Sequence, residues 1–163
     1  MNDLNEEGLA KLVTRGGIYY NVPGSTRDDI LSNIIAGLTA LPPGKSKWSD
    51  SLLQAVIERE ALISTGIENG IALPHPRTPM LKETDDPFVA IAFTKNPIDW
   101  ETPDGSQVHT VFLIVSKSPK QHLGALGKIN FLCQQKDFYN LLCAQASKEQ
   151  IVAALEEAEK GWG

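Results

Sequence analysis

One histidine of this sequence is held between two prolines, in Pro74-His75-Pro76, directly after the apolar run Ile71-Ala72-Leu73. Proline fixes its own φ and restricts the residue before it to extended conformations, so the backbone around His75 is expected to be stiff. Stiffness matters because a nucleophile misplaced by ~1 Å can lose about a hundredfold in rate. The segment therefore predicts a nucleophilic imidazole at the end of a short strand.

The residues before this histidine could hold an anion. Gly66 and Gly70 lie in the stretch STGIENG, where glycines let backbone amides approach an anion closely. Ser64 and Thr65 add hydroxyl donors, and Arg59 can offer a planar set of donors to phosphate oxygens. Each feature alone is more often structural than functional. Their combination favours phosphoryl transfer, which depends mainly on positioning and on stabilising charge.

The bulk composition is that of an ordinary globular domain. The 163 residues, 42% hydrophobic and 21% charged, predict one domain, 1–163 with its core at about 5–158. A net charge of -5 argues against general nucleic-acid binding. The apolar runs are too short to insert into a bilayer, and the acidic N-terminus is not typical of a signal peptide. Cys133 and Cys143 are expected to be reduced, buried thiols of a cytoplasmic protein.

Apolar periodicity divides the chain into alternating helices and strands. One helix is expected to begin at Ser25, with Asp28 as its capping partner, and to stop at Pro42-Pro43-Gly44. The other expected elements are a helical turn at about 6–13, a helix from Ser49 or Asp50 with Arg59 in its last turn, strands at 18–22, 71–73, 87–95 and 109–115, a turn at 102–105, and helices at 137–145 and at 148–160 with Ser147 and Gln150 as a capping box. Because the long strands are apolar on both faces, we expect a three-layer α/β/α sandwich with a mixed central sheet.

A second histidine lies at the start of another expected helix. Ser118 is expected to cap this helix, with Pro119 at its first position and Gln121 at its third. His122 then lies in about the first turn, where unpaired amides and the helix dipole favour anions and disfavour an imidazolium. We therefore expect His122 to be a neutral donor near pH 7. His109 opens an apolar strand, matches no motif and is expected to be structural.

The stretch STGIENGIALPHPR, after a helix that ends in IERE, resembles the active-site signature of the fructose/mannitol-type enzyme IIA of the bacterial phosphotransferase system. This family includes the nitrogen-regulatory enzyme IIA, and the similarity covers nearly the whole chain. The resemblance implies that His75 carries the phosphoryl group and that Arg59 contacts the phosphate. The stretch SPKQHL is similar to the second-histidine motif, which implies that His122 lines the same site. The chain departs from the family pattern at Glu68, often glycine in relatives, and at Pro76, which replaces a smaller residue.

The resemblance also implies a function. The chain is expected to be a phosphotransferase whose neutral His75 accepts a phosphoryl group from the histidine-containing phosphocarrier protein. The phosphohistidine would be held by Arg59, His122 and loop amides, and no metal or other cofactor is implied.

Three roles remain open at this point. The first is regulation, in the manner of the nitrogen-regulatory enzyme IIA, through regulatory target proteins that recognise the phosphorylation state. The second is sugar uptake, with delivery of phosphate to an enzyme IIB, and the third is a binding module that has lost phosphorylation. The standalone length, without a fused membrane domain or a cysteine on a strand-end loop, favours the first, and the intact His75, Arg59 and His122 speak against the third.

Overall fold

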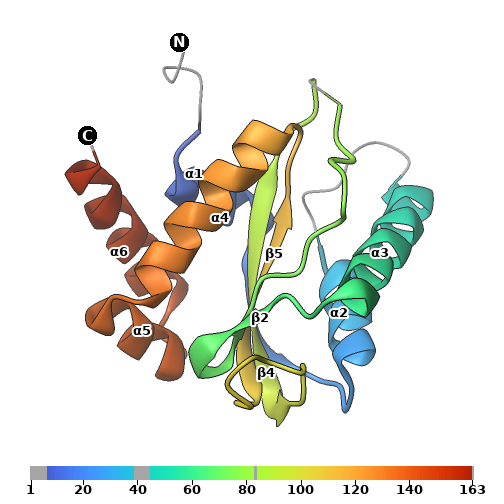
Figure 1. The fold of residues 1–163 in the computed structure, drawn as a ribbon. Helices are drawn as coiled ribbons and strands as arrows, with labels where there is room; N and C mark the ends of the chain where they lie inside the picture. The colour runs from blue at the N-terminus through green and yellow to red at the C-terminus, as the bar shows by residue number, and fades with distance from the viewer. Residues whose placement is uncertain (1–6, 39–44, 83, 163) are drawn as a thin grey trace.

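The computed structural model of the chain describes residues 7–38, 45–82 and 84–162 (Figure 1). Its centre is a five-stranded sheet in the order β1-β4-β5-β3-β2. The strands are β1 (Ile18–Val22), β2 (Gly66–Ile67), β3 (Ile71–Ala72), β4 (Phe88–Ile98) and β5 (Val108–Val115). The helices are α1 (Leu9–Gly16), α2 (Arg27–Ala36), α3 (Lys45–Leu62), a 3-10 turn (Glu68–Gly70), α4 (Pro119–Cys133), α5 (Lys136–Cys143) and α6 (Lys148–Gly161).

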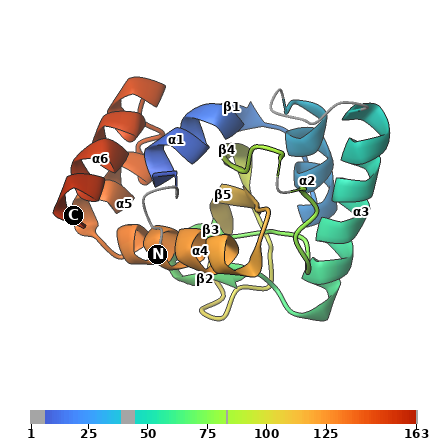
Figure 2. The ribbon, with the colours of Figure 1, turned by 90° about the horizontal axis from the view of Figure 1, so that it is seen from above.

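The sheet is mixed, as expected. β1 runs parallel to β4 and β3 runs parallel to β5, whereas the pairs β4–β5 and β2–β3 are antiparallel. Helices α1, α4, α5 and α6 cover one face of the sheet, and α2 and α3 cover the other (Figures 1 and 2). The three-layer sandwich is therefore confirmed.

Strand β4 shows why both faces must be covered. Val89, Ile91 and Phe93 belong to the buried cluster on one side, and Phe88, Ala90 and Ala92 belong to the cluster on the other. Successive strand residues point to opposite faces, so an unbroken apolar run requires helices above and below it.

The short strand β3 sets the position of the histidine that follows it. Ile71 lies opposite Thr110 of β5, and the N–H of Ile114 donates to the carbonyl of Pro74 at 3.0 Å. The backbone from 71 to 74 thus stays extended along β5 past the end of the assigned strand. His75 consequently lies near the carboxyl end of β5, beside the start of α4.

The local helix signals in the second half of the chain are confirmed. The Ser118 side chain caps α4 by accepting from the N–H of Gln121, with Pro119 at the first helical position. Ser147 and Gln150 form a complete capping box at α6. Gly105 donates its N–H to Thr102 at 3.1 Å, which closes the expected turn.

The first half of the chain departs from the expected boundaries. Helix α2 is capped by Thr26, which accepts from the N–H of Asp29, one residue later than expected. The carboxylate of Asp29 accepts from the N–H and hydroxyl of Ser25. Asp28, the expected capping partner, pairs with Arg27 at 3.1 Å instead. The expected stop at 42–44 lies outside the described residues.

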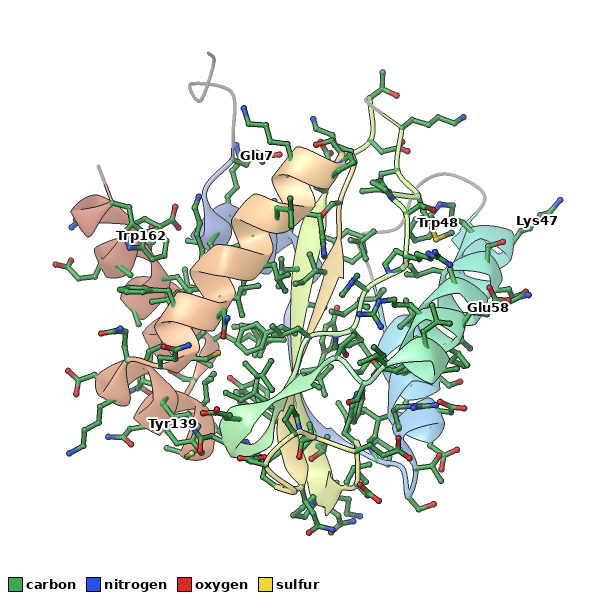
Figure 3. The ribbon with its side chains drawn as sticks, in the orientation of Figure 1. Glu7, Lys47, Trp48, Glu58, Tyr139 and Trp162 are labelled. Carbon is green, nitrogen blue, oxygen red and sulfur yellow. The ribbon has the colours of Figure 1, made fainter. Side chains whose placement is uncertain are left out.

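Two further helices begin away from their expected positions. Helix α3 begins at Lys45 rather than at Ser49 or Asp50, and the earlier start places Trp48 against the buried cluster between α3 and the sheet (Figure 3). Helix α1 occupies 9–16 rather than 6–13, because its buried stripe runs from Leu9 through Val13 to Gly16, which packs directly on the backbone of β4.

Both cysteines are free thiols, but only one is buried. Cys133 lies in the core, and burial raises the pKa of its thiol to about 12. Cys143 is exposed at the last position of α5, so the expectation of burial was wrong there. The short apolar stretch Leu141-Leu142-Cys143 does not reveal from its sequence which of its side chains face the core.

Candidate functional site

His75 has one ring nitrogen fixed by the backbone. Its Nδ1 lies 2.9 Å from the carbonyl oxygen of Leu73. A carbonyl oxygen can only accept, so Nδ1 carries the proton and donates, and Nε2 of the neutral ring keeps its lone pair. The ring is half-buried, and Nε2 has no hydrogen-bond partner within 7–38, 45–82 and 84–162. The geometry leaves a nucleophilic nitrogen available.

His122 lies directly beside this ring. The two imidazole centroids are 4.4 Å apart and the planes are tilted by 44°. His122 comes from the first turn of α4, where its N–H donates to the Ser118 carbonyl at 3.0 Å. The fold thus brings together the two histidines that the sequence singled out, although 46 intervening residues separate them.

Both imidazoles are neutral near pH 7 for physical reasons that can be separated. The pKa of His75 is lowered, and burial is the largest cause. The positive charge of Arg59 lowers this pKa further, whereas the hydrogen bond to Leu73 and the negative charge of Glu60 raise it. Burial, followed by the charges of His75 and Arg59, lowers the pKa of His122 to about 4. The expected neutrality of His122 is confirmed, but burial rather than the helix field is the main cause.

Arg59 lies in the last turn of α3, as expected. Its Nη1 donates to the carbonyl of Ile63 at 2.6 Å and so ties down the chain that leaves the helix. The guanidinium charge lowers the pKa of both His75 and His122, which places it within electrostatic reach of the pair. Arg59 therefore combines a structural contact with a positive charge beside the candidate nucleophile.

The other donors expected to hold a phosphate are engaged inside the protein. Ser64 Oγ donates to the Trp100 carbonyl at 2.5 Å and accepts from the N–H of Gly66 at 3.0 Å. Thr65 donates its hydroxyl to Glu60, and its N–H donates to the same carboxylate at 2.7 Å. These groups fix the connection between α3 and β3, and their donors point at protein atoms.

The segment with Gly66 and Gly70 is a β-hairpin, not an open anion-binding loop. β2 and β3 pair with Gly66 opposite Ala72, and the turn between them has Gly70 at φ 79. The N–H of Gly70 donates to Ser106 Oγ at 2.9 Å, and a side chain at this position would collide with the ring of His109. Gly70 and His75 are five positions apart along extended backbone, a span of roughly 16 Å.

The two departures from the family pattern lie in different places. Glu68 is exposed at the tip of the hairpin, at the far end from His75. Pro76 is buried and lines a hollow of about 280 Å³ together with His122, Leu123 and Arg77. Only the substitution at Pro76 thus touches the surroundings of the histidine pair.

Sequence reasoning missed Glu60. Its side chain is 2% exposed, and both carboxylate oxygens accept from Thr65. In the stretch IERE it looks like a surface acid beside Arg59. Helical spacing could have identified it, because Glu60 follows the buried Leu52 and Val56 at steps of four residues and therefore faces inward.

Two features are absent from the described residues. No three His, Cys, Asp or Glu side chains converge there in a way that could hold a metal ion. No helix in those ranges has the length and apolar character needed to cross a membrane.

Comparison with known proteins identifies the relatives of this chain. Residues 11–158 match the family model described as phosphoenolpyruvate-dependent sugar phosphotransferase system, EIIA 2. The nitrogen regulatory protein of Pseudomonas aeruginosa is 29% identical over 157 residues, which cover 94% of this chain and 97% of that protein.

A second relative is much longer than this chain. The fructose-specific EIIABC component of the phosphotransferase system of Bacillus subtilis is 26% identical over 154 residues. The matched region covers 93% of this chain but only 24% of that protein.

Among solved structures, the nitrogen regulatory protein IIA-Ntr of Neisseria meningitidis superposes with a TM-score of 0.73 at 21% identity, covering 90% of this chain and 97% of the other. The two chains share one fold.

Proposed function

Because the chain belongs to the EIIA 2 family of the phosphoenolpyruvate-dependent sugar phosphotransferase system, we propose that it is a phosphocarrier that accepts a phosphoryl group on Nε2 of His75. The observation that carries this proposal is the His75 ring, with Nδ1–H held on the Leu73 carbonyl at 2.9 Å and with His122 at 4.4 Å between centroids. The fixed tautomer leaves Nε2 as the nucleophile.

The reaction proceeds by in-line attack on a phosphohistidine of the donor protein. The Nε2 lone pair of His75 forms a new N–P bond while the N–P bond of the donor breaks, and its electron pair returns to the donor imidazole. His75 loses no proton from Nε2, because that nitrogen carries none. Its Nδ1–H stays on the Leu73 carbonyl, which stabilises the positive charge that the substituted ring acquires.

His122 and Arg59 stabilise the charge on the transferring group. A neutral His122 can donate one ring N–H to a phosphoryl oxygen, and its pKa of about 4 keeps it neutral at the pH of the cell. Arg59 supplies a permanent positive charge and N–H donors that suit phosphate oxygens. Such preorganised stabilisation is the main contribution a protein makes to phosphoryl transfer.

A protein is the fitting donor because exposed apolar side chains follow Arg59 and His122 closely in the chain, and Leu123 lines the same hollow as His122. Three of the four large hydrophobic side chains that the described residues expose follow Arg59 or His122 in the chain: Leu62, Ile63 and Leu123, at 60%, 73% and 66% exposure. Exposed apolar groups around a reactive centre mark protein contact surfaces. The family resemblance makes the histidine-containing phosphocarrier protein of the cytoplasm the expected donor.

We assign the downstream role to regulation. The nitrogen regulatory protein of P. aeruginosa is matched over 97% of its length, which supports a role in which the phosphorylation state decides the binding of regulatory target proteins. Transfer to an enzyme IIB during sugar uptake is the second candidate, and the match to the fructose-specific EIIABC component supports it.

The proposal is tested by incubating the protein with phosphoenolpyruvate and the purified donor proteins, followed by mass spectrometry with fragmentation. We expect one added phosphoryl group, located on His75, and ¹⁵N NMR of the product is expected to place it on Nε2. A chain that stays unmodified, or a group found on another residue, would reject the proposal and favour a binding module without phosphorylation.

The two downstream roles are separated by offering the phosphorylated protein an acceptor. Rapid, stoichiometric loss of the phosphoryl group to a purified fructose- or mannitol-type enzyme IIB would favour sugar uptake. A phosphoryl group that stays in place, with protein partners that bind only one of the two forms in a pull-down, would favour regulation.

A further inference from the structure

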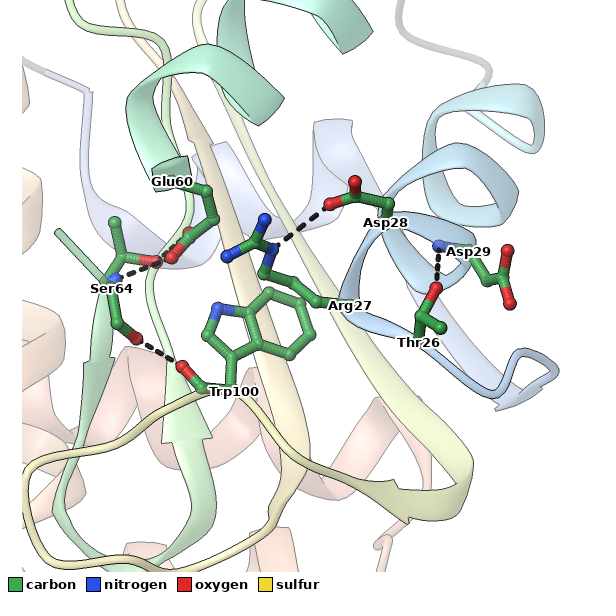
Figure 4. A network of polar contacts seen from close by, with 8 residues as sticks. Thr26, Arg27, Asp28, Asp29, Glu60, Ser64 and Trp100 are labelled. Carbon is green, nitrogen blue, oxygen red and sulfur yellow. Dashed lines mark hydrogen bonds and ion pairs between the residues drawn. The ribbon is translucent and has the colours of Figure 1, made fainter. Parts of the chain in front are cut away.

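Glu60 is a buried carboxylate close to the candidate nucleophile, and the mechanism above does not use it. It is 2% exposed at the end of α3, and no ion pair joins it to a Lys, Arg or His side chain in the part of the chain that the structure describes. Burying an unpaired carboxylate is unfavourable unless hydrogen bonds compensate it. The two bonds from Thr65 provide that compensation, one to each carboxylate oxygen. Figure 4 shows the carboxylate directed at the backbone next to Ser64.

A continuous series of hydrogen bonds leads from this carboxylate to the imidazole. Glu60 accepts from the N–H of Thr65 at 2.7 Å, and the Thr65 carbonyl accepts from the N–H of Leu73 at 3.1 Å. The Leu73 carbonyl then accepts from His75 Nδ1 at 2.9 Å. The last bond selects the tautomer of His75, so the position of Leu73 determines which nitrogen can react.

We propose that Glu60 is a positioning residue for phosphoryl transfer: by holding Thr65 it holds the strand that orients His75. The inference rests on the proposed function of His75. Glu60 does not contact the reacting atoms and acts through Thr65 and Leu73. The same turn of α3 also carries Arg59, whose bond to Ile63 fixes the other end of the connection, so one helix end aligns the nucleophile and its cation.

The negative charge of Glu60 has a second consequence for the same histidine. It raises the pKa of His75, against the lowering by burial and by Arg59. Loss of the charge alone is therefore expected to lower the pKa of His75. Loss of the hydrogen bonds is expected to let the His75 ring populate both neutral tautomers. Two substitutions separate these effects.

Glu60→Met fills the same volume but removes both hydrogen bonds. We expect the rate constant for phosphoryl acceptance at saturating donor to fall about tenfold, because the imidazole is less well held. The KM for the donor protein is expected to stay within about twofold, since the contact surface is intact. Glu60→Gln can still pair with both groups of Thr65, through its oxygen and its amide, and is expected to restore most of the rate.

Long-range ¹H–¹⁵N NMR of the imidazoles tests the same series of hydrogen bonds, from Glu60 to His75, without any phosphoryl donor. The parent is expected to show His75 as the Nδ1–H tautomer, Glu60→Met as a mixture of tautomers, and Glu60→Gln as the parental tautomer with a lower pKa. Potassium phosphoramidate serves as a small phosphoryl donor in a parallel reaction. If neither phosphoryl donor modifies the parent, the proposed function fails. The comparison of tautomers still shows whether Glu60 positions the His75 ring.

Glu58→Met is the matched control, because Glu58 is an exposed carboxylate on the same helix whose partner among the described residues is Gln54, at 3.0 Å (Figure 3). It is expected to behave like the parent. If Glu60→Met does not fold, Thr65→Val removes one of the two bonds and should shift rate and tautomer in the same direction. A folded Glu60→Met or Thr65→Val protein with parental rate and tautomer would overturn the proposal.

Discussion

Two histidines lie at opposite ends of the sheet region formed by β3 and β5, and the fold treats them differently. His109 has both ring nitrogens engaged, at 2.7 Å from Thr110 Oγ1 and at 3.1 Å from the Asn69 carbonyl. His75 has one nitrogen engaged, on Leu73. Burial lowers the pKa of both rings, so a lowered pKa does not distinguish them. The difference lies in the nitrogen that has no partner among the described residues.

The residues around the two histidines differ in the same way. At the His109 end, the tip of the hairpin is fixed from several sides, because Tyr139 donates to the Asn69 carbonyl at 2.9 Å and Asp104 accepts from the Asn69 N–H at 3.0 Å. At the His75 end, the neighbours are a second neutral imidazole, a guanidinium and exposed apolar side chains. One end stabilises the hairpin, and the other carries the proposed phosphoryl acceptor.

Removing each histidine in turn is expected to have the largest effects. His75→Ala is expected to abolish phosphoryl acceptance from the donor proteins, because it removes the proposed acceptor nitrogen. His109→Ala is expected to lower the melting temperature but to accept the group once folded. Quantitative mass spectrometry of both variants checks this, and a modified His75→Ala protein would show that the two ends were assigned wrongly.

A second prediction concerns Arg59, the cation at the His75 end. Arg59→Lys keeps the charge but loses the planar set of donors, so the rate of acceptance is expected to fall about a hundredfold, as when one preorganised donor is removed from a charge-stabilising site. Rapid-quench kinetics with phosphorylated donor measure the rate. The matched change Arg27→Lys on α2, where the arginine pairs with Asp28 at 3.1 Å, should leave the rate unchanged.

A third prediction uses the pH dependence of stability. Burial lowers the pKa of His75, His109 and His122 below the usual 6.5, so the unfolded chain binds protons that the folded chain does not. The contribution of these histidines to the free energy of unfolding is therefore fully present above pH 6.5. It is lost as the pH falls toward 4, where His122 titrates. Urea unfolding between pH 4 and 7 should show a shallower decline in His122→Gln than in the parent. An equal slope in the two proteins would mean that His122 is not buried as described.

The smallest expected effect belongs to the structural end. Tyr139→Phe removes the hydroxyl that donates to Asn69 and is expected to cost about 1 kcal/mol of unfolding free energy, the usual net value of one hydrogen bond. Phosphoryl acceptance should stay at the parental rate. A loss of rate at unchanged stability would show that the two ends are coupled, contrary to the division proposed above.

The parts of this molecule that sequence reasoning could predict are those determined by near neighbours. Ser118 with Gln121 and Ser147 with Gln150 are caps within four residues of chain, and both form as expected. The alternation in β4 likewise predicts two covered faces from consecutive residues. His75 and His122 were recognised because each belongs to a short local motif.

The parts that could not be predicted depend on partners distant in the chain. Gly70 looks like part of an anion-binding loop until Ser106, 36 residues later, is seen to accept its N–H. Ser64 has the same ambiguity, resolved by the carbonyl of Trp100. Glu60 is an intermediate case: helical spacing from Leu52 and Val56 places it on the inward face, but its hydrogen bonds to Thr65 depend on how the chain turns after α3.

The two edges of the sheet have a consequence for association in solution. The edge strand β2 is only two residues long, and β1 at the other edge is interrupted by Asn21 at φ 54 together with a shift of register against β4. Short or kinked edge strands offer few aligned backbone groups to an incoming strand, and this protects a sheet from edge-to-edge aggregation. The sheet edges therefore disfavour association through strand pairing, and the exposed Leu62, Ile63 and Leu123 are the side chains available for contacts with other proteins.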